Sequence, residues 1–199
     1  ERLVRREMLD SPLIKYLLQP ATEVSGDLLL ACTSRNGDVY VMLADATGHG
    51  LPAALTLIPL SQAFYAMAAK GFQLDTIVRE LNHQHRSYSP SDRFVAATMA
   101  MYNPRDSSIE VWNGGLPPAL LIGPQGQVLR SFHSHNLPLG ILPNDEFICE
   151  TETVQVPQDS HVLLFSDGLI EAENPVAEQF GLTRLQHCVA DGAVEQCLE

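Results

Sequence analysis

The chain has 199 residues, of which 45% are hydrophobic, and a formal net charge of −12. This length predicts one domain with a sizeable core, and the acidic balance argues against a nucleic-acid partner, because phosphate backbones select basic surfaces. The longest apolar stretch, residues 51–69, is interrupted by Pro52, Pro59, Ser61 and Gln62, so no membrane-spanning segment is predicted. The four cysteines lack Cys-x-x-Cys spacing, which is typical of reduced thiols in a cytoplasmic protein and argues against a structural zinc site.

Residues 1–20 predict a linker helix in two pieces ahead of the main domain. Ser11 and Pro12 are typical of the start of the second piece. We expect the apolar face of this piece to pack on the domain or to pair with a second copy in a homodimer. The chain does not begin with Met, so we expect it to be a fragment of a longer protein. The apolar residues of the second piece are Leu13, Ile14, Tyr16, Leu17 and Leu18.

Residues 28–33 and 39–44 predict two strands, and Asn36-Gly37 between them is typical of a tight hairpin turn. The hairpin places Asp27 at the start of one strand and Asp45 at the end of its antiparallel neighbour. We therefore expect the two carboxylates to lie side by side.

The rest of the chain alternates between predicted hairpins and long helices. This order indicates an α+β fold in which antiparallel sheets are flanked by helices. Helices are predicted over residues 50–70 and 75–87 and from residue 182, and strands over 94–102, 109–112, 119–122, 128–132, 147–156 and 162–165.

Three acids, Asp27, Asp45 and Asp167, lie at or near the ends of apolar runs, with glycines close by. A single acid in such a place is usually a solvated side chain at a sheet rim. Two adjacent carboxylates, however, repel each other unless a cation lies between them. If the fold brings all three acids together, their oxygens form a site suited to Mg²⁺ or Mn²⁺.

Gly48, His49 and Gly50 follow Asp45 and open the helix predicted from residue 50. A glycine-rich turn at a helix N-terminus offers backbone N–H groups to an anion such as phosphate. A metal pair beside such a turn implies metal-assisted hydrolysis of a phosphate ester.

Several motifs, in order along nearly the whole chain, resemble the metal-dependent Ser/Thr protein phosphatases of type 2C (the PPM family), in the bacterial SpoIIE/RsbU-like branch. They are Thr-Glu-Val-Ser-Gly-Asp at 22–27, Ala-Asp-Ala-Thr-Gly-His-Gly-Leu-Pro-Ala-Ala at 44–54, Trp-Asn-Gly-Gly-Leu-Pro-Pro-Ala at 112–119, Leu-Pro-Leu-Gly-Ile at 137–141, Phe-Ser-Asp-Gly-Leu-Ile-Glu-Ala at 165–172 and Phe-Gly at 180–181.

The resemblance implies that residues 21–199 form a four-layer α-β-β-α sandwich of two mainly antiparallel sheets with two Mg²⁺ or Mn²⁺ ions at the sheet ends. It implies Asp45 as the bridging ligand and Asp27 with the backbone carbonyl of Ala46 on one ion. Asp167 would hold the other ion. Asp45 and Asp27 are thus the catalytic candidates, and residues 48–50 are the candidates for binding phosphate.

Family resemblance also implies a substrate and a context. Relatives of this kind act on phosphoserine or phosphothreonine in a partner protein, often an anti-sigma-factor antagonist of the STAS type. Their phosphatase domain usually follows a receiver or sensor domain, so the chain would be the cytoplasmic output domain of a response regulator in a two-component system.

Two departures from the family pattern keep an alternative open. The family usually has a further acid in an Asp-Asp-x-Thr strand, which the sequence lacks up to Glu199, and its Ala-Gly-His reads Gly114-Gly115-Leu116 here. We expect the domain to continue past residue 199 and the Asp167 ion to be weak without that acid. The alternative function is a phosphatase-fold adaptor that has lost turnover and regulates by binding. A metal nuclease conflicts with the acidic charge.

Two histidine pairs, His83 with His85 and His133 with His135, have the His-x-His spacing but no evident third ligand. We expect them to be exposed or locally hydrogen-bonded. His49 beside the expected site has the titration range of a general acid, but its position alone is weak support for that role. Trp112 is expected in the core.

Overall fold

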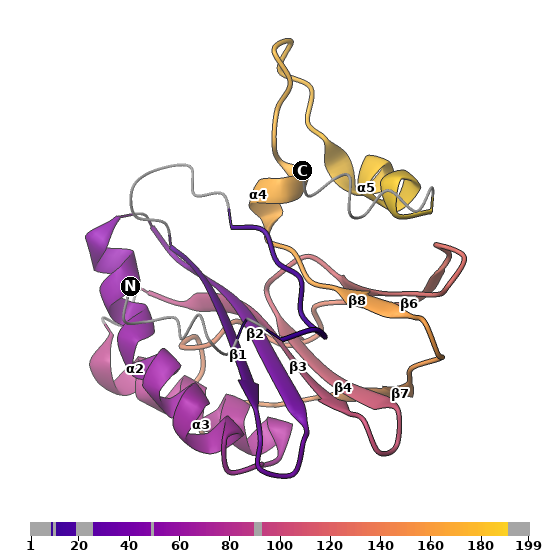
Figure 1. Ribbon diagram of the computed structural model, residues 1–199. Coiled ribbons are helices and arrows are strands. Elements are labelled where there is room, and N and C mark those ends of the chain that lie inside the picture. The colour runs from indigo at the N-terminus through magenta and orange to yellow at the C-terminus, as the bar shows by residue number, and fades with distance from the viewer. Residues whose placement is uncertain (1–8, 10, 19–25, 49, 90–92, 191–199) are drawn as a thin grey trace.

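The computed structural model describes residues 9, 11–18, 26–48, 50–89 and 93–190. Within these ranges, strands and helices follow one another as the hairpin pattern predicts (Figure 1). The strands are β1 (Asp27–Thr33), β2 (Val39–Ala46), β3 (Val95–Asn103), β4 (Ser108–Gly114), β5 (Ala119–Ile122), β6 (Val128–Phe132), β7 (Glu152–Gln155) and β8 (His161–Leu163). The helices are α2 (Leu51–Ala68), α3 (Leu74–Tyr88), α4 (Asp167–Ile170) and α5 (Gly181–Ala190).

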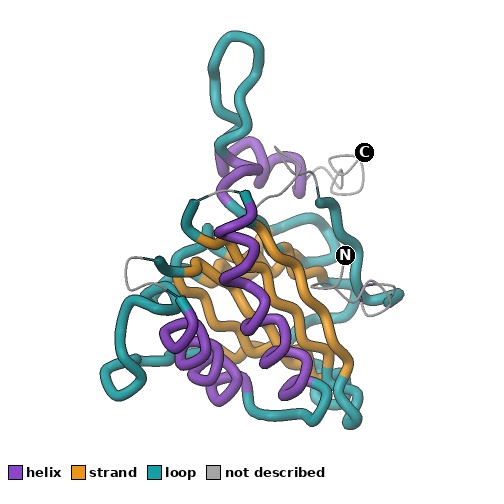
Figure 2. The backbone as a smooth tube through the Cα atoms, turned by 90° about the vertical axis from the view of Figure 1, so that its left-hand side faces the viewer, coloured by secondary structure: helices purple, strands orange, loops and turns teal. Residues whose placement is uncertain are grey.

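The strands form two antiparallel sheets, one with the order β1-β2-β3-β4-β7 and one with the order β6-β5-β8. Side chains alternate between the two faces of each strand. In β1, Leu28 and Leu30 pack with α2 and α3, whereas Leu29 and Ala31 pack on the opposite face. Helices α2 and α3 cover one face of the larger sheet (Figure 2).

Helices α2 and α3 form because their sequences bury one face each. In α3, the buried residues recur at the spacing of a helix stripe: Leu74, Ile77, Val78, Leu81, Asn82 and His85. Pro52 lies in the first turn of α2, where its missing N–H has no intrahelical partner in any case. Among the described helices, none has the length together with the hydropathy that crossing a lipid bilayer would take.

The smaller sheet lies between the larger sheet and helix α5. Ala119 and Leu121 of β5 face the larger sheet and pack with Ile109 and Val111 of β4. Their neighbours Leu120 and Ile122 face outward and pack with Leu185 and Val189 of α5. The layers are therefore α2 with α3, the larger sheet, the smaller sheet and α5, which confirms the predicted four-layer α+β sandwich.

The predicted linker helix is wrong for residues 11–18, which form one turn followed by non-helical chain. The N–H of Ile14 donates to the Ser11 carbonyl at 3.0 Å, and the N–H of Leu13 to the Ser11 hydroxyl at 3.3 Å. Ile14 packs against the buried cluster that includes Leu9 and Leu29, but Leu13 and Leu17 stay exposed. A short helix forms mainly when an amphipathic face packs, and this segment packs only in part. Residues 1–8, 10, 19 and 20 lie outside the described residues.

The strand predicted over residues 147–156 is shorter than expected, because β7 covers only Glu152–Gln155. Backbone groups before β7 bond to side chains rather than to a neighbouring strand. The Phe147 carbonyl accepts from Arg79 at 2.7 Å, and the N–H of Glu150 donates to Asn136 at 2.8 Å. Phe147 itself packs against the buried Trp112, which confirms Trp112 as a core residue.

Candidate metal centre

Asp27 and Asp45 are directly opposite each other in the β1–β2 ladder, as the hairpin predicts. The turn between the strands includes Gly37 with φ 90°, a conformation that glycine adopts at little cost. Alternation along the strands places both acids on the face shared with Leu29 and Leu43, turned away from α2 and α3. The two carboxylates therefore lie side by side at one end of the larger sheet.

Backbone and side-chain oxygens converge around Gly26, just before Asp27. A Cβ atom at Gly26 would lie 2.8 Å from the Ala46 carbonyl oxygen and 3.2 Å from both Oδ1 of Asp45 and the Gly48 carbonyl oxygen. The Gly26 carbonyl in turn accepts the Ala46 N–H at 3.0 Å. Among the described residues, this donor set consists of carboxylate and carbonyl oxygens, which Mg²⁺ and Mn²⁺ prefer. The residues present therefore fit the expected ion.

Asp167 comes from a different part of the fold and begins the short helix α4 rather than ending a strand. It is nevertheless electrostatically coupled to the hairpin acids. Burial, followed by the charges of Asp27 and Asp167, raises the pKa of Asp45 to about 6. Burial and then the Asp167 charge also raise the pKa of Asp27.

Mutual repulsion of this kind is what a bound cation relieves. Across residues 9, 11–18, 26–48, 50–89 and 93–190, no three acidic, His or Cys side chains are close enough to make a complete cation site. The charge of Asp167 thus acts on Asp27 and Asp45, but the three side chains do not form a preassembled metal site.

The turn after Asp45 has the conformation expected of its glycines. Gly48 has φ 91° and Gly50 has φ 75°, values that L side chains rarely adopt. Gly50 is the residue before α2, and no side chain caps that helix end. The backbone is therefore compatible with the predicted anion-binding turn, while His49 lies outside the described residues.

Polar residues on α3 hold the loop around residues 139–144 through hydrogen bonds that the sequence did not predict. The Gly140 N–H donates to Oδ1 of Asn82 at 2.8 Å, and the amide nitrogen of Asn82 donates to the Leu142 carbonyl at 3.1 Å. Arg86 donates to the Gly140 carbonyl at 2.9 Å. The sequence holds one indication of these contacts: Asn82 and His85 both lie on the apolar stripe of α3, where a polar side chain needs a hydrogen-bond partner.

His85 ties the same helix to the chain that enters β3. Its Nε2 lies 3.0 Å from the Arg93 carbonyl oxygen, and its Nδ1 lies 3.1 Å from the Ser89 hydroxyl. Burial lowers the pKa of His85, so its neutral form is favoured. This confirms the expectation of a locally bonded histidine. In the other pair, the rings of His133 and His135 lie 6.2 Å apart on exposed residues.

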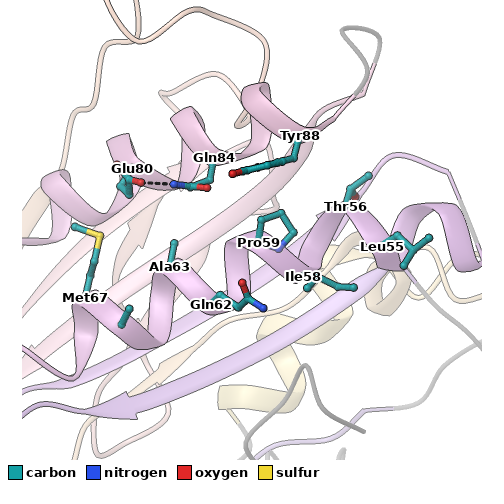
Figure 3. A pocket seen from close by; sticks show the side chains of 11 residues that line it. Leu55, Thr56, Ile58, Pro59, Gln62, Ala63, Met67, Glu80, Gln84 and Tyr88 are labelled. Atoms are coloured by element: carbon teal, nitrogen blue, oxygen red, sulfur yellow. Dashed lines mark hydrogen bonds between the residues drawn. The ribbon is translucent and has the colours of Figure 1, made fainter.

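A cavity of about 750 Å³ lies between α2 and α3 (Figure 3). Its walls include Pro59 and Met67 from α2, and Tyr88 from α3. The one acid lining it, Glu80, accepts a hydrogen bond from Gln84 at 2.5 Å. None of the predicted metal ligands lines this cavity. The candidate metal site is therefore the end of the larger sheet at Asp27 and Asp45, and not this cavity.

Two curated proteins are similar in sequence to most of this chain. The RsbP phosphoserine phosphatase of Bacillus subtilis (strain 168) is 24% identical over 180 residues, which cover 85% of this chain and 44% of that protein. The RsbU phosphoserine phosphatase of the same organism is 23% identical over 186 residues, covering 92% of this chain and 54% of that protein. The chain thus spans about half the length of these curated relatives.

A solved structure agrees with these relatives. The SiaA PP2C domain of Pseudomonas aeruginosa superposes with a TM-score of 0.80 over 96% of this chain and 77% of that chain, at 18% identity. The family model described as Stage II sporulation protein E (SpoIIE) matches residues 35–199. Because this match covers most of the chain, the resemblance seen in the motifs is confirmed: the chain belongs to the SpoIIE family of PP2C-type protein serine/threonine phosphatases.

Proposed function

We propose that this chain is the metal-dependent phosphatase domain of a bacterial signalling protein and hydrolyses phosphoserine or phosphothreonine in a partner protein. The observation that carries the proposal is the direct pairing of Asp27 with Asp45 beside the converging oxygens of Ala46 and Gly48. Membership of the SpoIIE family supports it, as do the names of the two phosphoserine phosphatases among the relatives.

The proposed ligand roles follow from the positions of the acids. Asp45 would serve both ions, Asp27 and the Ala46 carbonyl would complete one, and Asp167 would hold the other. When bound, the ions would supply a water of lowered pKa and positive charge for the phosphoryl oxygens. The chain's own part would be to hold Asp27 and Asp45 in register, and the proposed phosphate-binding groups are the backbone N–H groups of residues 48–50.

The proposed partner is a STAS-type antagonist of an anti-sigma factor, and the proposed arrangement places a receiver or sensor domain before this one. A homodimer through residues 13–18 stays a prediction, supported by the exposure of Leu13 (64%), Leu17 (49%) and Leu18 (45%). These side chains offer an apolar surface that either a second copy or an adjoining domain would cover.

Phosphate release from a phosphoserine peptide, measured with Mn²⁺, with Mg²⁺ and with EDTA, tests the proposal. We expect release with either ion and none with EDTA. Hydrolysis that is insensitive to EDTA would contradict metal dependence. Binding of the phosphopeptide without release, with either ion present, would favour the adaptor function instead. Release by the wild-type chain but not by a D45N variant would assign the activity to this site.

A further inference from the structure

Thr47, the residue after Ala46, makes two hydrogen bonds to Phe94 at the entrance to β3. Its N–H donates to the Phe94 carbonyl at 3.1 Å, and its hydroxyl accepts the Phe94 N–H at 3.3 Å. This contact lies one residue past Ala46 and Val95, the last pair of the β2–β3 ladder. We call these two bonds the Thr47 clamp.

The Thr47 clamp replaces what would be the next rung of the ladder. Opposite residues of an antiparallel ladder alternate between pairs that exchange both backbone hydrogen bonds and pairs that exchange none, and Thr47 with Phe94 would be a pair of the first kind. Here the Thr47 hydroxyl accepts the Phe94 N–H in place of the Thr47 carbonyl. The backbone can therefore leave the sheet at Thr47 and enter the turn at Gly48, which has φ 91°, without losing its hold on β3.

The clamp also fixes the direction of the Ala46 carbonyl. The C=O and N–H of a trans peptide point in opposite directions within its plane. Since the N–H of Thr47 points toward β3, the Ala46 carbonyl points toward β1. The 2.8 Å between its oxygen and a Cβ built on Gly26 agrees with this direction. The oxygen thus faces the strand that begins with Asp27.

We infer that Thr47 is a positioning residue for the metal centre, whose hydroxyl holds the Ala46–Thr47 peptide so that the Ala46 carbonyl is aimed at the acid pair. The inference rests on the proposed function, because it takes that carbonyl to be a ligand. Groups that orient metal ligands typically change metal affinity by about 10–100-fold when they are removed.

The test compares T47V, which keeps the branched shape but loses the hydroxyl, with T47S, which keeps the hydroxyl. We expect Mn²⁺ to bind about tenfold more weakly to T47V and with nearly wild-type affinity to T47S, measured by titration calorimetry below the melting transition. T47A removes the hydroxyl without adding a methyl group, and we expect the same loss from it should T47V unfold. A lower melting temperature with unchanged Mn²⁺ affinity in T47V or T47A would mean a merely structural role and would overturn the inference.

Amide hydrogen exchange at Phe94 separates this inference from the proposed function, because it needs no metal. We expect faster exchange of the Phe94 N–H in T47V than in T47S. Equal exchange in the two variants would overturn the clamp itself. Failure of the unchanged chain to bind Mn²⁺ or to hydrolyse the phosphopeptide would overturn the proposed function and the ligand role of Ala46, whatever the exchange result.

Discussion

The two sides of the candidate site are built very differently. Asp27 and Asp45 lie in a β1–β2 ladder of seven residue pairs, which has packed clusters on both faces. Asp167 follows the three-residue strand β8 and begins the four-residue helix α4, in which no residue is buried. The hairpin side therefore holds its carboxylates in place before any ion binds, whereas the Asp167 side has little packing to hold its ligand. Preorganised ligands bind an ion more tightly, so the two sides should differ in affinity.

The largest effect is expected from D45N, which removes a charge from the preorganised side. We expect a fall in phosphate release of more than about 100-fold, because changes outside the ligand shell alone cost about 10–100-fold. The melting temperature should not fall, since Asn has the same shape and the repulsion from Asp27 is removed. Phosphate release and thermal melting of D45N beside the wild type measure this. An active D45N would contradict the bridging role.

G26A tests the close oxygen packing on the same side. Its Cβ would lie 2.8 Å from the Ala46 oxygen, so the backbone must shift, and we expect a loss of roughly 1–3 kcal/mol in unfolding free energy. Mn²⁺ affinity should fall as well. G168A is the matched control on the Asp167 side, where the nearest atom to a new Cβ is at 3.8 Å.

In G168A, we expect stability to be unchanged or raised by less than about 1 kcal/mol, because alanine favours a helix more than glycine does. Urea unfolding of both variants gives the comparison. Equal stability of G26A and G168A would contradict this expectation, because it would mean that the oxygens around Gly26 can move aside at no cost in stability.

The affinity difference itself can be measured by titrating the chain with Mn²⁺. We expect one tighter site, formed by Asp27 and Asp45, and one weaker or absent site that needs Asp167. D167N should remove only the weaker Mn²⁺-binding site. A chain extended past residue 199 should bind Mn²⁺ more tightly at that site if the extension supplies an acid. Two equally tight sites in the present chain would contradict the comparison.

The smallest effect is expected from His85, which holds the chain entering β3. Because its pKa is lowered in the folded state, the unfolded chain takes up a proton that the folded chain does not. Its contribution to stability is therefore fully present above the unfolded pKa of about 6.5 and is lost as pH falls below that value, by at most about 1.4 kcal/mol per pH unit.

Urea unfolding at pH 7.5, 6.5 and 5.5 measures this loss as the difference between wild type and H85Q. The exposed neighbour His83 supplies the control variant H83Q, which should follow the wild type. The same pH dependence in H85Q and wild type would contradict the role of His85.

The hairpin side was predictable from sequence because its information is local. Asn36-Gly37 between two apolar runs predicts the turn. Once the turn is placed, the pairing of Asp27 with Asp45 follows from the lengths of the two strands. The position of Asp167 at the start of α4 was not predictable, because its surroundings depend on how the two sheets stack.

Two other features depend on tertiary contacts in the same way. Asn82 on α3 bonds to Gly140, far along the chain, and no local pattern encodes that pair. The apolar run from Leu13 to Leu18 predicts a helix, but a short helix needs a face to pack against, and most of these side chains stay exposed.

The placement of Asp27 and Asp45 within one hairpin also has a consequence for the order of folding. A hairpin closes in about 1–10 μs, whereas contacts between distant segments form more slowly. The two like charges should therefore meet early, well before Asp167, which needs the smaller sheet and α4. At that stage their repulsion opposes closure of β1 on β2, and a divalent cation would remove the opposition. The ion would then act as a folding partner of the hairpin as well as a participant in the chemistry of the finished domain.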